Sequence, residues 1–476
     1  MDWIVLLPPV VAIVLALWTK EVYMSLLTGL WLGTTIMVGG NPITGLRELI
    51  DQLVAVFGDA GNTRILIFSL LVGGLIALVQ ASGGVAGFIA WAQKRGWGTT
   101  RRGAEILAWA IGMIIFVESS ITCLIVGAVN RPLFERLKMP REKLAFYCDA
   151  TSAPVCMSIP LNGWGAYVLG LLAAQGITVG AVGLLANSLL FNFYSIVAIV
   201  GTLVLAITGW QFGSMKKAEE RALATGQVIR PGSTPLIAKE IAELEPVPGS
   251  GEKAIHLLLP IAVMVAMIFV GLYITGDGQL MQGSGSTSVL WAVCAAVGSA
   301  MIMYALPGSG ANGKALMKPV ESVGLVLKGS AGLVGMVILV VLAFALGQVS
   351  RALEMGPYVV NLLGTGWPTW WIPALVFLIG CFVSFTLGSS WTAYAVLIPI
   401  ALPLAEGLGI APALMLGAVL SGGVFGDHAS PLSDTSLISS MSAACDHVDH
   451  INTQMSYALV MGGLSFVAFL VAGLLN

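Results

Sequence analysis

Long apolar stretches recur along the whole chain, and they restrict its fold more than any other feature. A helix needs about 20 mainly apolar residues to cross a bilayer, because its backbone polar groups must be paired within the segment. Only 10% of the 476 residues are charged and 57% are hydrophobic, whereas about a quarter of the residues in soluble proteins are charged. The sequence therefore predicts an all-α polytopic membrane protein, and its net charge of −2 gives no indication of a nucleic-acid partner.

The apolar stretches form two sets, separated by a polar segment. Residues 211–253 hold six basic and six acidic residues together with Gly and Pro, a composition typical of a solvated linker. We therefore divide the chain into a first half (1–210), a cytoplasmic linker (211–253) and a second half (254–476). The expected spans, the fourth of each set interrupted, are 3–19, 21–39, 64–81, 142–178 and 181–209, then 254–274, 288–306, 331–350, 411–446 and 454–475. Residues 3–19 lack a basic region before them and are predicted to be a retained span rather than a signal peptide.

Two further apolar segments, 103–137 and 370–405, are too long for one span and have polar centres. These centres are Glu118 to Thr122 and Gly388 to Thr392. Each segment is predicted to be a re-entrant helical hairpin that enters the membrane and turns back. Two full spans per segment is the alternative, which hydropathy leaves open.

Lysine and arginine are distributed unevenly between the two expected sides of the membrane. With the linker in the cytoplasm, 19 of the 22 basic residues fall in cytoplasmic segments, and only Arg47, Arg64 and Arg351 fall outside. Such an excess is the usual signal of membrane orientation. It predicts a multi-pass protein of the cell inner membrane with both termini outside the cytoplasm.

Short sequence matches relate the two halves. Ser119-Ser120-Ile121-Thr122 recurs as Ser389-Ser390-Trp391-Thr392 at an offset of 270, and Pro160-Leu161-Asn162 recurs as Pro431-Leu432-Ser433 at an offset of 271. Five spans and one hairpin give each half an odd number of crossings, so the halves must be inverted repeats. This architecture is common in secondary transporters.

Residues Gly426 to Thr435 place ionisable and hydroxyl side chains inside an apolar stretch. Ionisable groups at bilayer depth are costly and mark ion or proton pathways. Pro431 breaks a helix because it has no backbone N–H, and a broken helix is a usual ion site in carriers. The oxygen ligands expected for Na⁺ in this half are those of Asp427, Asp434, Ser430, Ser433 and Thr435.

Proton and Na⁺ can compete for one carboxylate, because burial favours its protonated form and a bound cation its ionised form. Such competition is sufficient for coupled exchange, with His428 as a candidate proton relay or pH sensor and also as a candidate substrate contact. The alternative is that one Asp caps a half-helix and that His428 faces a polar loop.

The first half carries matching polar groups. Glu118 at the hairpin centre and Asp149 before the interrupted stretch are the candidate acidic ligands of Na⁺. Hairpin tips offer unpaired backbone groups and hydroxyls that bind ions or carboxylates. Candidate substrate contacts are therefore Ser119, Ser120, Thr122, Asn162, Ser389, Ser390 and Thr392. The alternatives are a bond from each hydroxyl to a carbonyl one turn earlier and a capping role for Asp149.

Two other patterns suggest no metal chemistry. Asp446, His447, Asp449 and His450 have metal-like spacing, but we interpret them as a solvated cytoplasmic loop. The six cysteines lack the spacing of metal ligands, and buried small hydrophobes are the interpretation that fits them.

At these positions the sequence resembles the NhaC-type sodium/proton antiporter family, within a larger ion transporter superfamily that also contains dicarboxylate carriers. The resemblance covers most of the chain. It rests on Gly426-Asp427-His428-x-Ser430-Pro431-x-Ser433-Asp434-Thr435, on Arg141 to Ala145, on Asp149 to Pro154 and on Pro160 to Trp164. It implies exchange of Na⁺ for H⁺, with some relatives exchanging organic acids such as malate and lactate. It also implies a scaffold and a moving transport domain, often in a homodimer.

One departure from the family pattern concerns the cargo. The family often has adjacent aspartates at the first hairpin tip, where this chain has Glu118-Ser119-Ser120. The missing acid puts a simple sodium/proton stoichiometry in doubt, and paired serines would also suit a substrate carboxylate.

The sequence therefore predicts a Na⁺/H⁺ antiporter that works by alternating access of the elevator type, without a cofactor. The alternative is a sodium-coupled transporter or exchanger of a small organic acid or amino acid. Inverted repeats with broken helices favour a carrier over a channel, which needs a continuous pore. No nucleophile–base pair or metal motif supports an enzyme.

Overall fold

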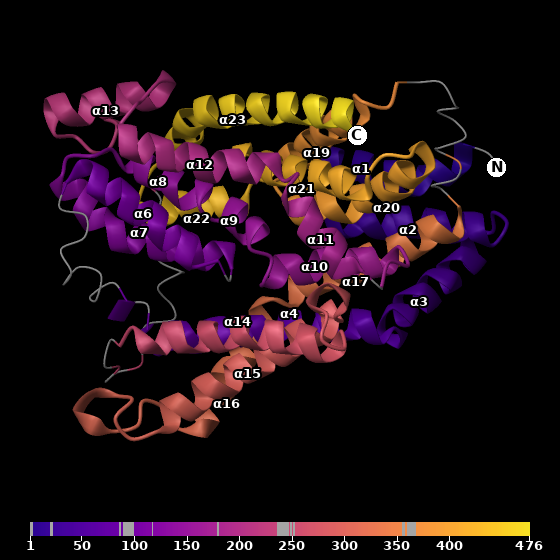
Figure 1. The fold of residues 1–476 in the computed structure, drawn as a ribbon, viewed down its shortest axis with the longest axis horizontal. Helices are drawn as coiled ribbons and strands as arrows, with labels where there is room; N and C mark the ends of the chain where they lie inside the picture. Colours follow the sequence, from indigo (N-terminus) through magenta and orange to yellow (C-terminus); the bar gives the residue numbers. More distant parts are fainter. Residues whose placement is uncertain are drawn as a thin grey trace.

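The computed structural model describes residues 3–19, 22–84, 87–88, 100–116, 118–178, 180–235, 247, 250, 253–354, 358 and 368–476. Every regular element in these ranges is a helix (Figure 1). Lys20, Lys94 and Arg95, three of the basic residues used to predict the topology, lie outside the described residues, as does 236–246 of the linker.

The first half holds eleven α-helices within the described ranges. Helices α3 and α11 were not expected as separate elements, and the predicted span 142–178 is divided among α8, α9 and α10. The bounds are α1 (Leu7–Thr19, after the 3₁₀ turn η1, Trp3–Leu6), α2 (Val22–Met37), α3 (Pro42–Gly58), α4 (Ala60–Ala81), α6 (Arg101–Ile114), α7 (Ser119–Arg136), α8 (Arg141–Ala150), α9 (Ala153–Ser158), α10 (Gly163–Ala174), α11 (Ala181–Leu189) and α12 (Phe193–Thr208).

The linker begins with one helix, and nine α-helices follow in the described part of the second half. The predicted span 411–446 is interrupted between α21 and α22, as expected. The bounds are α13 (Gly213–Thr225), α14 (Ile255–Thr275), α15 (Gly285–Ala305), α16 (Pro319–Gly332), α17 (Val334–Ala352), α19 (Ile372–Leu387), α20 (Ser390–Leu408), α21 (Pro412–Ala429), α22 (Asp434–Ser442) and α23 (His447–Leu475), with short turns η3 (Leu280–Gln282) and η4 (Ala311–Gly313).

Several of these helices are long and apolar enough to cross a membrane. Six qualify within the described residues, namely α4, α12 with its continuation, α14, α15, α20 and α23, and the total reaches eight if the two bent helix pairs each count as one span. The prediction of an all-α polytopic membrane protein is thereby confirmed.

The first predicted hairpin consists of α6 and α7, which pack against each other. Helix α6 has 14 residues and is therefore about 21 Å long, at 1.5 Å per residue, which is shorter than the bilayer core of about 30 Å. This length favours a re-entrant hairpin over two full spans.

The second predicted hairpin consists of α19 and α20, which turn at Gly388. This glycine has φ +65°, and a Cβ there would come within 2.5 Å of the backbone of Leu432, so the turn needs glycine and touches the break between α21 and α22. Helix α20 has 19 residues and is long enough to span. The choice between hairpin and two spans therefore stays a prediction in the second half.

Helices of each half pack against helices of the other half in a reciprocal pattern. Helix α4 of the first half packs against α15 and α16, and α17 of the second half packs against α2 and α3. Likewise α7 packs against α22, and α20 packs against α10. Two halves related by a pseudo-two-fold axis would pack in this way, which supports the predicted duplication. Their inversion across the membrane stays a prediction.

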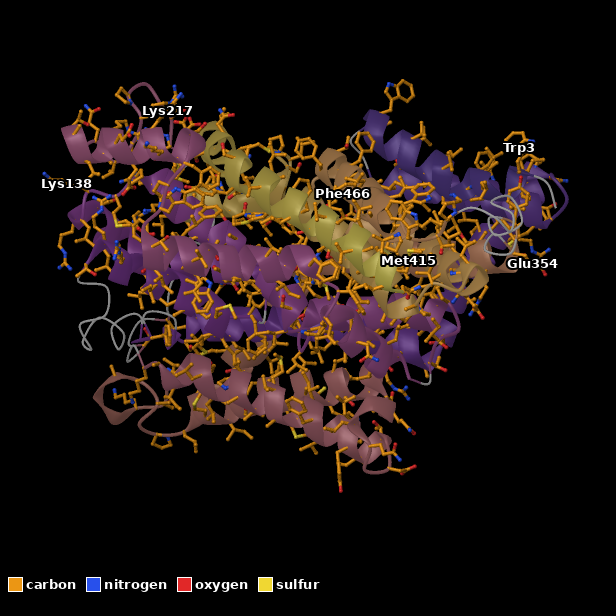
Figure 2. The ribbon with its side chains drawn as sticks, turned by 45° about the horizontal axis from the view of Figure 1, so that its top comes forward. Trp3, Lys138, Lys217, Glu354, Met415 and Phe466 are labelled. Carbon is orange, nitrogen blue, oxygen red and sulfur yellow. The ribbon has the colours of Figure 1, made fainter. Side chains whose placement is uncertain are left out.

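The expected cytoplasmic and opposite sides lie at opposite ends of the molecule. Figure 2 shows Lys138 and Lys217 at one end and Trp3 and Glu354 at the other. The connection α6–α8 and the start of the linker thus share an end, as the distribution of basic residues predicts. Which end faces the cytoplasm stays a prediction.

The start of the linker is helical and packs on the rest of the molecule through one face of α13, although most residues of 213–235 are exposed, as predicted for a solvated linker. Glu219 of α13 forms ion pairs with Arg101 and Lys143, and Arg221 lies 2.8 Å from Glu142. Glu219 and Arg221 thus pair with charges at the starts of α6 and α8, whereas Lys216 and Glu220 are exposed. Composition alone does not reveal such pairing.

Candidate functional site

The break between α21 and α22 positions the main polar cluster of the second half. Helix α21 ends at Ala429, and Ser433 caps the start of α22 by accepting a hydrogen bond from Ser436 N. The hydroxyl of Ser430 donates to the carbonyl oxygen of Phe385 at 2.6 Å. The break is therefore attached to the hairpin of its own half.

Asp427 is the buried carboxylate of this break, with 2% of its surface exposed. Ser433 donates to its Oδ1 at 2.6 Å, and Ser390 at the start of α20 donates to its Oδ2 at 2.8 Å. The hydroxyl of Thr435 lies 2.9 Å from that of Ser433. In the described part of the chain, no lysine or arginine forms an ion pair with Asp427. Its charge therefore has hydroxyl neighbours but no cation.

Asp434, the other carboxylate predicted here, lies differently. It is exposed, and its Oδ1 accepts a hydrogen bond from the backbone N–H of Thr435 at 2.8 Å. No hydrogen bond joins it to Asp427 within the described residues. The structure thus groups Asp427 with Ser390, Ser433 and Thr435, and leaves Asp434 at the start of α22.

His428 is fully buried, so the alternative that it faces a polar loop is wrong. Its Nδ1 lies 2.6 Å from the hydroxyl of Tyr194 in α12, and its ring stacks on Phe146. Its Nε2 has no hydrogen-bond partner among the described residues. No pattern in the sequence pointed to Tyr194, which lies more than 200 residues away.

Asp149, near the end of α8, is the second buried carboxylate. Its Oδ2 accepts hydrogen bonds of 2.7 Å from Ser436 and from Gln454 of α23. Its Oδ1 has no partner in the described ranges. It binds side chains of the second half rather than capping its own helix, so the capping alternative is not what the structure shows.

Gln454 connects this carboxylate with the broken helix. Its Nε2 donates both to Asp149 and to the carbonyl oxygen of His428, and its Oε1 lies 2.8 Å from Nε2 of His450. Sequence reasoning missed Gln454, although a glutamine inside the apolar span 454–475 was an available signal. It also missed Ser436.

We expected the segment from Asp446 to His450 to be a solvated loop, and the structure shows that this is wrong for part of it. Asp449 and His450 are buried, and His450 lies 2.8 Å from the hydroxyl of Ser440. Asp446 caps α23 and also accepts hydrogen bonds from Thr234. Partial burial acts to raise the pKa of Asp446, but the hydrogen bonds from Thr234 and the amides of α23 outweigh it and lower the pKa.

No group of three or more His, Cys, Asp or Glu side chains suited to a metal occurs within the described residues. A Na⁺ site here would consist of Asp427 with hydroxyl oxygens, a hard oxygen donor set.

The first hairpin tip holds Glu118, which is half-buried and whose Oε1 accepts a hydrogen bond of 3.2 Å from Ser119. Thr122 donates to the carbonyl oxygens of Glu118 and Ile115, so its hydroxyl bonds to backbone as the alternative proposed. Ser120 is half-buried.

Asn162 occupies the position in the first half that Ser433 occupies in the second, the N-cap of the helix after the break. Its Oδ1 accepts from the backbone of Trp164 at 2.8 Å and of Gly165 at 3.3 Å. Its Nδ2 donates to the carbonyl oxygen of Phe116 at 2.7 Å, as Ser430 donates to that of Phe385. In both halves, the broken helix is hydrogen-bonded to a phenylalanine two or three residues before its own hairpin tip.

The second hairpin tip also contacts the broken helix of the first half. Trp391 packs on Trp164 and Tyr167 of α10, with ring centroids 5.3 and 4.6 Å apart, and Tyr167 donates to its carbonyl oxygen. Ser389 caps α20, and Oγ1 of buried Thr392 has no partner within the described ranges.

Comparison with known proteins places these features in a family context. The profile of the Na⁺/H⁺ antiporter family matches residues 155–474. An uncharacterised protein of Haemophilus influenzae is 30% identical over 98% of this chain and 90% of its own length. Shorter matches cover about a fifth of both chains: the malate-2H⁺/Na⁺-lactate antiporter of Bacillus subtilis (32% identical, 19% of each chain) and the Na⁺/H⁺ antiporter NhaC of Alkalihalophilus pseudofirmus (33%, 22% of each).

A solved structure has a similar fold. The YdaH transporter of Alcanivorax borkumensis superposes with a TM-score of 0.54, covering 90% of this chain and 88% of its own, at 17% sequence identity. At this identity the likeness concerns the fold alone.

Proposed function

The chain belongs to the Na⁺/H⁺ antiporter family and is a secondary transporter rather than an enzyme, and we propose that it exchanges Na⁺ for H⁺ across the cell inner membrane, with Asp427 as the ligand that both ions share. The proposal concerns the cargo and the residues that bind it.

The observation that carries this proposal is the burial of Asp427 without a cationic partner in the described part of the chain. An unpaired ionised carboxylate in apolar surroundings is costly, and an opposite charge or a proton removes most of that cost. Asp427 therefore favours one occupant at a time, either H⁺ or Na⁺. Release of one on binding the other couples the two fluxes.

The ligands of Na⁺ would be the carboxylate of Asp427 and the hydroxyl oxygens of Ser390 and Ser433. These side chains come from the hairpin α19–α20 and from the break before α22. We propose that this hairpin and broken helix move together, as the transport part of an elevator-type carrier, relative to a scaffold that includes α4 and α15. We also propose that the protein is a homodimer.

The test is reconstitution of the full chain into vesicles that contain a pH-sensitive dye. An inward Na⁺ gradient should drive proton efflux without any organic solute, and Asp427→Asn should abolish it. Asp277→Asn is a control, because Asp277 lies in the α14–α15 connection at φ +48°, a conformation that asparagine also adopts readily. Asp434→Asn compares the two acids of the motif. If Asp434→Asn abolishes exchange while Asp427→Asn retains it, the shared ligand is Asp434.

A second candidate function is sodium-coupled exchange of a small organic acid or amino acid. It is favoured by the unpartnered hydroxyl of Thr392 beside the aromatic rings of Trp164 and Trp391, and by the similarity to a malate-2H⁺/Na⁺-lactate antiporter. The same vesicles discriminate between the two candidates. If Na⁺ moves no protons and only an added organic solute produces flux, the Na⁺/H⁺ proposal is wrong.

A further inference from the structure

A polar pocket and an apolar pocket adjoin each other where α10 and α11 meet the connection between α14 and α15. Figure 1 shows α10 and α11 beside this connection, and their contacts with α15 and η3 agree. The polar pocket has a volume of about 330 Å³ and the apolar pocket about 210 Å³. Leu169 and Gly285 line both pockets, so the two share a wall.

The polar pocket is lined by one basic and one acidic side chain. Arg64 of α4 lines it and is half-buried, and no hydrogen bond or ion pair to its guanidinium occurs within the described residues. Asp59 is the acid in the lining, and its Oδ1 already accepts the N–H of Asn62 at 2.7 Å. Ser284 and Ser286, at the start of α15, add hydroxyls and a helix N-terminus, which favours a negative charge.

Because α14 and α15 are long and apolar enough to cross a membrane, we expect the two pockets to follow one another along the membrane normal, as the parts of a phospholipid do. The polar pocket includes Gln282 and Ser284, which lie in the connection between two spans and hence near the headgroup level. The apolar pocket lies deeper along these helices: Ile268 and Phe269 precede the end of α14 by about two turns, and Val289 lies one turn into α15. Phe269 is 45% exposed, so the apolar pocket opens toward the lipid.

We propose that this pair of pockets binds one anionic phospholipid, with the phosphate beside Arg64 and one acyl chain in the apolar pocket. A guanidinium pairs well with phosphate oxygens, and the acyl chain removes apolar surface from water or loosely packed lipid. A small free anion would fill the polar pocket and leave the apolar one empty. The adjacency of the two pockets therefore favours a lipid.

The proposed lipid would touch the broken helix of the first half. Pro160 and Leu161, which precede the cap Asn162, line the apolar pocket. The opposite walls belong to α14 and α15. An acyl chain at this position lies between the break before α10 and the neighbouring helices of the second half, so its occupancy affects how readily these parts move past each other.

The experiment uses the full chain, stripped of lipid in detergent and incubated with an equal mixture of dioleoyl phosphatidylglycerol and dioleoyl phosphatidylcholine. Native mass spectrometry then measures which lipid stays bound. The unmodified protein should retain the phosphatidylglycerol in preference. Arg64→Gln should lower this preference about fivefold, the effect of losing about 1 kcal/mol from one basic residue near a lipid surface. Arg64→Lys should keep most of it.

Two controls separate the headgroup from the acyl chain. Arg47→Gln changes an exposed arginine of α3 and should leave lipid retention unchanged. Ala186→Trp fills the apolar pocket and should lower the retention of both lipids. If Arg64→Gln retains as much phosphatidylglycerol as the unmodified protein, or if glycerol 3-phosphate binds as tightly as the lipid, the proposal is wrong.

Discussion

The hydroxyl of Ser390 donates a hydrogen bond of 2.8 Å to Oδ2 of Asp427, and this contact joins the start of α20 to the end of α21. The hydrogen bonding of the carboxylate therefore depends on the position of the hairpin tip, because a shift of the tip removes one of its two hydroxyl donors. A site shared in this way keeps its geometry only while the hairpin and the broken helix stay together.

The first prediction concerns these hydroxyl donors. Ser390→Ala and Ser433→Ala should each raise the KM for Na⁺ at least about tenfold, because a hydrogen bond to a charged group contributes about 1.5–3 kcal/mol. The measurement is Na⁺-dependent proton flux in vesicles. Ser465→Ala is the control, since that hydroxyl only donates to Met461 O within its own helix. An unchanged KM in both variants would remove these serines from the site.

The second prediction concerns the buried ion pair under α13. Lys143 and Glu105 are almost fully buried, and Lys143 also faces Glu219 at 3.6 Å. Lys143→Met leaves Glu105 without its cation and should lower the unfolding free energy by about 3–5 kcal/mol. Thermal unfolding in detergent measures this, and adding Glu105→Gln should restore much of the loss. A double variant as unstable as Lys143→Met would show that packing, not charge, is responsible.

The helices and breaks could largely be predicted from the sequence, because lipid permits few arrangements of an apolar backbone. The matching motifs Pro160-Leu161-Asn162 and Pro431-Leu432-Ser433 marked the two breaks. Asp427 was singled out because a carboxylate at bilayer depth is costly. The partners could not be predicted in the same way. Gln454 reaches Asp149 across 305 residues, and no local pattern encodes such a contact.

The errors have a common physical cause. The charges of 213–235 and of the segment around His450 have the composition of solvated loops. In the structure, some of these groups have partners on other helices, as Glu219 does with Arg101 and His450 does with Ser440. Burial of a polar group depends on whether a partner is present, and the partner lies elsewhere in the sequence.

The third prediction concerns Asp446, which caps α23 and binds Thr234. Asp446→Ala should lower stability at neutral pH by about 1 kcal/mol, as expected for loss of an N-cap. Because hydrogen bonds lower the folded-state pKa of Asp446, their contribution is complete above the unfolded-state pKa of about 3.9 and is lost as the pH falls through the folded value. Thermal unfolding should thus show a gap between variant and unmodified protein that closes on acidification. Asp51→Ala, on the exposed face of α3, is the control. A gap that is the same at all pH values would contradict the prediction.

The fourth prediction tests the tie between the first broken helix and its hairpin. Asn162 caps α10 with its oxygen and donates through Nδ2 to the carbonyl oxygens of Phe116, Cys156 and Ile159 at 2.7–2.9 Å. Asn162→Asp keeps the oxygen that caps the helix but loses the side-chain N–H donors. It places a carboxylate oxygen next to the three carbonyl oxygens that these donors bound. Loss of stability should reach about 2 kcal/mol or more, since a buried acceptor left unpaired costs about 1–3 kcal/mol.

A matched control exists in the same chain. Asn41 caps α3 through its oxygen, which accepts from Ile43 N at 3.0 Å, and it is exposed. Asn41→Asp should therefore be neutral or slightly stabilising, because Asp is an equally good N-cap and a negative charge suits a helix N-terminus. The unfolding temperature and the rate of Na⁺-driven proton flux should both decline for Asn162→Asp and stay unchanged for Asn41→Asp. If the two variants behave alike, Asn162 acts only as a cap, and the break before α10 is not held to the first hairpin through its side chain.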